Sequence, residues 1–286
     1  MRTIHLDAAT VLLQWSVGGL AFLWVTGRRR EVGIGYGWLL RLTYGAMAVA
    51  ALAVSGITDR VWGREVATVG VIVATGAALA VSVVRRKAGV SGQRELRDRR
   101  RARVAAMTGI DRHAAEPDPD VAEFPPALDL LAPAIGVIGL VFAGVHAGHP
   151  AVLAVARTIA GAAFLGSISD AMLLGHWYLV QPGLTRGPLR ELVKWTGLVW
   201  PVEVLLLLVP TGMVSVLNGH IDDGYGGMLG WMWVTCAVTT IGLVLVTRAA
   251  LRERYYSAVM AATGLLYLAI LTAFGTDLVA RALLSG

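Results

Sequence analysis

Eight long apolar stretches are the feature that most constrains this chain. A run of about 20 apolar residues spans the ~30 Å hydrocarbon core of a bilayer as a helix. Backbone groups in lipid find no water, so a spanning segment must satisfy them internally, as an α-helix does. Barrel strands are shorter and alternate polar with apolar residues, which these stretches do not do. The sequence therefore predicts an all-α polytopic transmembrane helical bundle of about eight helices, with residues 1–286 forming one integral membrane domain.

The charged residues are few and fall mostly between these stretches. They make up 15% of the chain, whereas a soluble domain carries about 25%. The expected spans are Ala8–Thr26, Tyr36–Ile57, Val66–Val84, Leu128–Ala147, Ala151–Val180, Leu189–Leu217, Met228–Thr247 and Ala258–Leu284.

Clusters of arginine occupy alternate gaps between the spans. Positive residues stay on the cytoplasmic side of a membrane, so these gaps are predicted to face the cytoplasm and both termini to lie outside. The first span has no small-residue cleavage site, which favours a retained helix over a signal peptide. The threading predicts a multi-pass protein of a bacterial-type inner (plasma) membrane. The clusters are Arg28–Arg30, Arg85–Lys87, Arg186 with Arg190 and Lys194, and Arg248 with Arg252 and Arg254.

The gap at 85–126 is the longest segment predicted to lie outside the membrane. Its first half is basic, and we expect the segment 85–103 to form an interfacial helix on anionic lipid. Its second half is acidic and rich in proline, which predicts partial disorder. The net charge of +6 follows from membrane topology, so no nucleic-acid partner is expected. A partner within a membrane complex stays open.

Two carboxylates lie deep inside predicted spans, where an ionisable residue is costly and marks functional sites. At 1.5 Å per residue, Asp170 lies about 15 Å and Glu203 about 21 Å from the inner ends of their spans. A short turn joins these spans, so the carboxylates should differ in depth by about one helical turn. If both face the seam, they can share or pass a proton. Alternatively, each donates one structural hydrogen bond, with Ser167, Ser169 and Thr196 as candidate partners.

His176, Trp177 and Lys194 are the candidate contact for a quinone head or an anion near the inner interface. The alternative is an aromatic belt whose histidine forms an interfacial hydrogen bond. The sequence requires no cofactor. An internal haem with two histidine ligands is not expected, because His146 and His176 are predicted at opposite ends of the membrane. Cys236 is the single cysteine, which excludes disulfides within the chain and Cys-ligated clusters.

A second group of polar residues is predicted at the outer side. Asp277 and Arg281 are spaced i,i+4 and should form an ion pair, and Arg157 is placed to extend that outer polar network. Imidazole and carboxylate groups in nearby loops are candidate ligands for a divalent metal, with ordinary loop hydrogen bonding as the alternative. These candidate ligands are His146, His149, His220, Asp222 and Asp223.

The sequence contains no P-loop, no GxSxG and no HExxH motif, which argues against an enzyme. The preferred hypothesis is proton-linked transport of a small solute or ion, with Asp170 and Glu203 as the proton-handling pair. The first alternative is a quinone-contacting membrane subunit of a redox complex. The second is a non-catalytic structural or assembly protein of the membrane.

Overall fold

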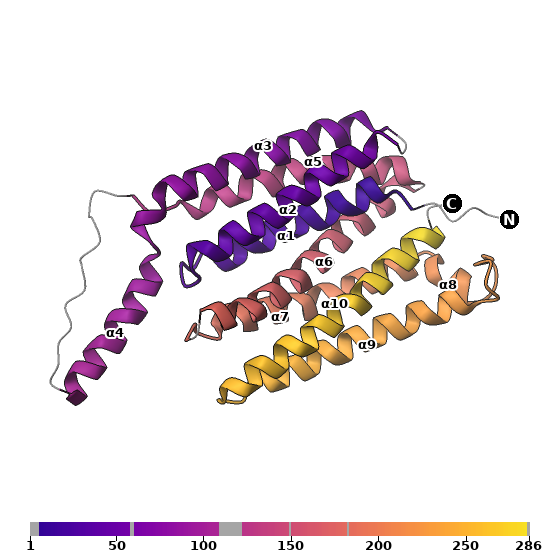
Figure 1. Ribbon diagram of the computed structural model, residues 1–286. Helices are drawn as coiled ribbons and strands as arrows, with labels where there is room; N and C mark the ends of the chain where they lie inside the picture. Colours follow the sequence, from indigo (N-terminus) through magenta and orange to yellow (C-terminus); the bar gives the residue numbers. More distant parts are fainter. Residues whose placement is uncertain (1–5, 58–59, 109–121, 149, 182, 285–286) are drawn as a thin grey trace.

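The structure is a computed structural model that describes residues 6–57, 60–108, 122–148, 150–181 and 183–284. Within these ranges it is helical and contains no strand, which confirms the predicted all-α bundle (Figure 1). The long helices are α1 (Ala8–Gly27), α2 (Ile34–Ser55), α3 (Trp62–Val84), α5 (Leu131–Ala147), α6 (Ala151–Val180), α7 (Gly187–Leu208), α9 (Met228–Ala250) and α10 (Tyr256–Leu284). The remaining elements are η1 (Arg85–Ala88), α4 (Ser91–Thr108), η2 (Pro126–Leu130) and α8 (Gly212–Leu217).

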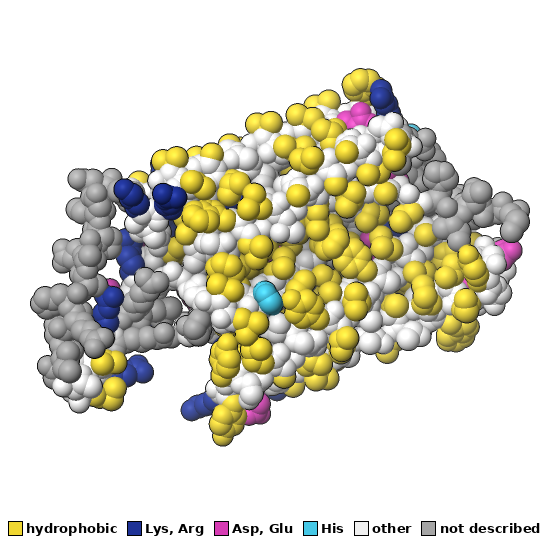
Figure 2. Space-filling view, viewed as in Figure 1, with side chains coloured by type: hydrophobic (Ala, Val, Ile, Leu, Met, Phe, Trp, Pro, Cys, Tyr) yellow, Lys and Arg dark blue, Asp and Glu magenta, His cyan; other side chains and the backbone are white. Residues whose placement is uncertain are grey.

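Seven of the described helical segments are long and apolar enough to cross a membrane, so the chain is a multi-pass membrane protein. The remaining predicted span, Leu189–Leu217, corresponds to α7, which also runs along the bundle (Figure 1). It does not meet the same apolar criterion, because Arg190, Glu191, Lys194 and Glu203 lie within it. Figure 2 shows one face of the molecule, where apolar side chains extend along the length of the bundle.

Successive long helices run in opposite directions, so the loops alternate between the two ends (Figure 1). All four predicted arginine clusters follow helices that end at one end, which we call the inner end. The start of α1 and the end of α10 lie together at the opposite, outer end (Figure 1). The alternation of arginine along the sequence thus corresponds to one arginine-rich end of the bundle. That this end faces the cytoplasm stays a prediction.

Helix α1 lies inside the bundle and packs against α2, α5 and α6. Its backbone comes so close to α6 that a Cβ on Gly18 would lie 1.8 Å from the carbonyl oxygen of Ala162. A Cβ on Gly166 would meet the Gly18 backbone at 2.2 Å. Small residues permit this close approach of two helices in lipid. We call the meeting of Gly18, Ala162 and Gly166 the glycine contact.

The basic half of the gap at 85–126 is helical, as η1 and α4, and α4 extends away from the bundle (Figure 1). The carboxylate of Glu123 forms ion pairs with Arg30, which follows α1, and with Arg94 of α4. These pairs connect the chain near Glu123 to the inner end of the bundle. Most of the acidic half, for which disorder was predicted, lies outside the described residues. Lipid binding by the segment 85–103 stays a prediction.

The predicted span Leu189–Leu217 is interrupted, because α7 ends at Leu208 and the short α8 follows. Pro210 has no N–H to donate, which is consistent with a helix end at this point. The guanidinium of Arg157 covers the exposed carbonyls, with Nε donating to Leu206 O at 2.8 Å and Nη2 to Val209 O at 2.5 Å. An irregular backbone at membrane depth needs such internal partners. The break therefore lies beside a half-buried cation from α6.

Candidate functional site

Four helices bring five polar residues together in the outer half of the bundle, and we call this group the outer cluster. Its centre is Asp277 of α10, which is fully buried. Nε of Arg281 donates to both carboxylate oxygens of Asp277 at 2.9 Å, so the predicted i,i+4 ion pair is confirmed. Nε2 of Gln14, from α1, lies 3.2 Å from each of the same oxygens. The members are Gln14, Arg157, Glu203, Asp277 and Arg281.

The outer cluster depends on a glycine in α6. A Cβ on Gly161 would lie 2.3 Å from Nε2 of Gln14, 2.4 Å from Oδ1 of Asp277 and 2.7 Å from Nη2 of Arg281. Any side chain there would displace the cluster. Neither Gln14 nor Gly161 was singled out from the sequence. A glutamine inside an apolar helix near the N-terminus was the available signal, because a polar side chain in a span needs a partner.

Glu203 of α7 is the unusual member of the outer cluster. It is fully buried, and neither carboxylate oxygen receives a hydrogen bond from an N–H or O–H of the described residues. Its carboxyl group instead lies against that of Asp277 and within the field of Arg281 and Arg157. Two carboxyl groups in contact can form a hydrogen bond only when one of them carries a proton. The pair can therefore hold one proton between them.

A cavity leads toward the outer cluster from the outer end. It has a volume of about 90 Å³ and lies between α1, α6, α7 and α10. Arg157 and Arg281 line its deep side, while Asp7 and Leu284 line it at the helix ends. Such a volume has room for several water molecules. Two members of the outer cluster thus line this space directly, and we call it the outer cavity.

Asp170 of α6 lies in a second buried group that we call the inner acid site. Its Oδ1 accepts a hydrogen bond from the hydroxyl of Tyr44 at 2.5 Å, while Oδ2 has no donor among the described residues. The hydroxyl of Tyr36 donates to the backbone oxygen of Asp170 at 3.2 Å. Both tyrosines come from α2. Asp170 is thus fully buried with one of its two carboxylate oxygens in use.

The partners expected for the acids are engaged elsewhere. The hydroxyls of Ser167, Ser169 and Thr196 donate to carbonyls of their own helices. Ser169 also accepts from Nε1 of Trp15 at 2.7 Å. A hydroxyl that back-bonds to its own helix is common in apolar helices. The expected hydrogen bonds from these three hydroxyls to the acids are therefore absent, and the donor to Asp170 is Tyr44.

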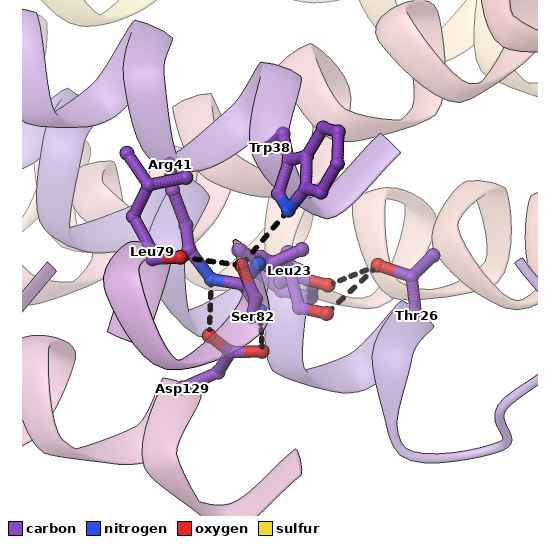
Figure 3. Close-up of polar contacts among 8 residues, drawn as sticks. Leu23, Thr26, Trp38, Arg41, Leu79, Ser82 and Asp129 are labelled. Carbon is purple, nitrogen blue, oxygen red and sulfur yellow. Dashed lines mark hydrogen bonds and ion pairs between the residues drawn. The ribbon is translucent and has the colours of Figure 1, made fainter. Parts of the chain in front are cut away.

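A buried ion pair joins α2 to η2 (Figure 3). Nε and Nη2 of Arg41 donate to the two oxygens of Asp129 at 2.8 and 2.7 Å, and both side chains are 4% exposed. The guanidinium also lies over the ring of Phe124, 4.4 Å from its centroid. Figure 3 shows the Trp38–Ser82 hydrogen bond alongside. The sequence analysis did not single out this pair.

A second cavity adjoins the ion pair, and we call it the inner cavity. It has a volume of about 60 Å³ and is lined by Arg41, Asp129 and Tyr36 among others. Nη1 of Arg41 is buried without an acceptor among the described residues. Tyr36 thus both lines the inner cavity and reaches Asp170 with its hydroxyl. The inner acid site lies one tyrosine away from this cavity.

The structure does not bring Asp170 and Glu203 together. Asp170 faces α2 and Glu203 faces α10, and no described contact joins them. In α6, the glycine contact lies between Asp170 and Gly161, the position that faces the outer cluster. The predicted shared seam between α6 and α7 is therefore absent at the two acids. They belong to two separate buried groups.

His176, Trp177 and Lys194 also do not form one site. Nδ1 of His176 lies 3.3 Å from the hydroxyl of Tyr267 in α10. Trp177 points toward α2, where its ring lies 6.0 Å from that of Tyr36. Lys194 lines a cavity between α7 and α9. These three residues therefore lie toward the inner end of the bundle but face different neighbours.

The predicted metal ligands at the outer end gain no support from the described residues, among which no three His, Cys, Asp or Glu side chains gather. His149 lies outside the described residues. Oδ1 and Oδ2 of Asp223 accept hydrogen bonds from the backbone of Gly227, Tyr225 and Leu229 at 2.8–2.9 Å. These donors lower the pKa of Asp223. Asp223 therefore caps the start of α9. The other predicted ligands, His146, His220 and Asp222, are not part of any such group among the described residues.

Comparison with protein-family models, with curated proteins and with solved structures gave no match to this chain. What the chain does must therefore be inferred from its own geometry.

Proposed function

We propose that this membrane protein transports a small solute or ion together with protons, and that Glu203 and Asp170 bind the protons. The observation that carries the proposal is the burial of Glu203 without a hydrogen-bond donor and against the carboxyl group of Asp277. A buried acid with a purely structural role is expected to be hydrogen-bonded. A carboxyl pair that holds one proton can instead accept and release it.

Access from both ends supports the proposal. The outer cavity reaches Arg157 and Arg281 of the outer cluster. The inner cavity reaches Tyr36, which contacts Asp170. The glycine contact lies between the two buried groups and leaves no room for a side chain. A carrier needs such a closed region between two access routes, because an open path would dissipate the gradient.

The interruption between α7 and α8 is a further supporting feature. Transporters commonly form ion and substrate sites at broken helices, whose free backbone groups and end dipoles face the ligand. Here Arg157 contacts both the broken backbone and the outer cluster, since its carbonyl oxygen accepts from Nη2 of Arg281 at 3.0 Å. A change of charge at Glu203 would therefore alter the electrostatic interactions of Arg157 with the broken backbone. Through these interactions, protonation of Glu203 can change the conformation at the break between α7 and α8.

The test is infrared difference spectroscopy of purified protein stepped between mildly acidic and mildly alkaline pH. The wild type should show the carbonyl band of a protonated carboxyl that changes with pH, and Glu203→Gln should lose it. Asp170→Asn should remove a separate component. Asp222→Asn, at an exposed acid of the outer loop, is the matched control and should retain both.

The same variants should be compared in proteoliposomes that contain a pH-sensitive dye. We expect wild-type vesicles to acidify under an imposed pH gradient, and Glu203→Gln and Asp170→Asn vesicles to stay unchanged. If neither variant alters the carboxyl band or the proton flux, the proposal fails.

A further inference from the structure

Four cationic side chains line a cavity between α7 and α9 at the inner end, and we call it the basic cavity. Its volume is about 410 Å³, and no Asp or Glu contributes to its lining. Two buried apolar side chains complete it. The lining residues are Arg190, Val193, Lys194, Arg248, Leu251 and Arg252.

One of the four cations is held by the protein, and three are not. Nε and Nη2 of Arg190 donate to Leu251 O at 3.1 and 2.5 Å, which covers the carbonyl end of α9. Lys194, Arg248 and Arg252 are exposed and have no acceptor among the described residues. Three cations therefore share one cavity without a counter-charge from the part of the chain that the structure describes.

The spacing of these cations concentrates their charge. Arg190 and Lys194 are four residues apart on α7, while Arg248 lies in the last turn of α9 and Arg252 in the turn that follows α9. Residues four apart lie on the same helix face, and like charges there destabilise the helix slightly. Glu191, the nearest acid on α7, is engaged on another side by Arg28 and Arg29. An anion from outside the described chain would relieve this repulsion.

We propose that the basic cavity binds a phosphate group. Guanidinium and ammonium groups converging on one space match the several oxygens of a phosphate, and arginine binds phosphate in a bidentate manner. The cavity lies at the arginine-rich end, where the headgroups of anionic lipids are found in a membrane. The phosphate can come from a lipid headgroup or from free inorganic phosphate. This inference is independent of the proposed proton transport, because it uses neither buried acid.

The experiment uses the full-length protein in nanodiscs of phosphatidylcholine, with and without phosphatidylglycerol. Thermal unfolding and native mass spectrometry report lipid binding. A parallel arm adds inorganic phosphate to nanodiscs of phosphatidylcholine alone, with chloride at equal ionic strength as the reference. The test variant is Arg248→Gln, which leaves Arg190 in place. The matched control is Arg254→Gln, which removes one exposed charge at the same end, outside both the basic cavity and the segment 85–103.

We expect the test variant to weaken binding about tenfold or more, since a guanidinium hydrogen bond to a phosphate oxygen is charge-assisted and contributes about that much. The control variant should change it much less. Stabilisation by phosphatidylglycerol alone would identify a lipid headgroup, and stabilisation by phosphate would identify the free anion. Equal losses in the two variants would overturn the proposal, because they would show diffuse attraction to the membrane. Absence of binding by both ligands in the wild type would also overturn it.

Discussion

Replacing Glu203 with glutamine should make this protein more stable while removing its proton-binding group. Glutamine has nearly the shape of glutamate but carries an amide N–H₂. In the structure this amide would face the carboxylate of Asp277, against which the Glu203 carboxyl lies. It would therefore donate a hydrogen bond that the native carboxyl makes only when it is protonated.

The magnitude follows from the chemistry of the outer cluster. A hydrogen bond to a charged acceptor contributes about 1.5–3 kcal/mol. Glu203→Gln also forgoes the weaker attraction to Arg281 and Arg157, so we expect a net gain of about 1–2 kcal/mol. Asp277→Asn is the contrasting variant, because it leaves the guanidinium of Arg281 without its carboxylate. Breaking a buried ion pair in this way costs about 3–5 kcal/mol.

Thermal unfolding of the detergent-purified variants, followed by circular dichroism, measures both effects. For a chain of this size, 1 kcal/mol corresponds to roughly 2–4 °C in the unfolding midpoint. The Glu203→Gln midpoint should rise and the Asp277→Asn midpoint should fall clearly below the wild type. A Glu203→Gln midpoint lowered as far as that of Asp277→Asn would refute the reasoning. It would mean that Glu203 is a structural acceptor whose charge the fold requires.

Three further predictions concern other parts of the fold. Asp129→Ala should lower the free energy of unfolding by about 3–5 kcal/mol, and Arg41→Met/Asp129→Leu by much less, which a double-mutant cycle measures. Gly166→Ala should cost about 1–3 kcal/mol because its Cβ would meet the α1 backbone, whereas Gly264→Ala, with open space around it, should cost nothing in the same assay. Backbone donors lower the pKa of Asp223, so its contribution is present above its unfolded pKa of about 3.9 and lost as pH falls through the folded pKa; acid unfolding curves of Asp223→Ala should lack that part of the pH dependence.

The sequence predicted what is local and missed what depends on helix rotation. Helix length, antiparallel order and the Asp277–Arg281 pair are set by residues close together in the chain. The partners of the buried acids come from distant helices, as Gln14 does for Asp277 and Tyr44 does for Asp170. In lipid-facing helices that are apolar on most sides, the apolar pattern does not tell which face turns inward. The position of each acid along its helix was therefore predictable, but its neighbours were not.

Helix α7 shows how the charges of this bundle divide between structure and function. It is the long helix that does not meet the apolar criterion of the other seven, and charges in a spanning helix persist where something compensates them. Glu191 is paired with two arginines, and Arg190 covers the end of α9. Two charged residues of α7 lack such a structural partner among the described residues, namely Lys194 in the basic cavity and Glu203 in the outer cluster. Placing a charged residue in a membrane-spanning helix costs free energy. Where no residue of the fold offsets that cost, a bound ligand or proton is the best explanation for the charge. We therefore propose that Lys194 faces an anion at the inner end of α7 and that Glu203 binds a proton near its outer end.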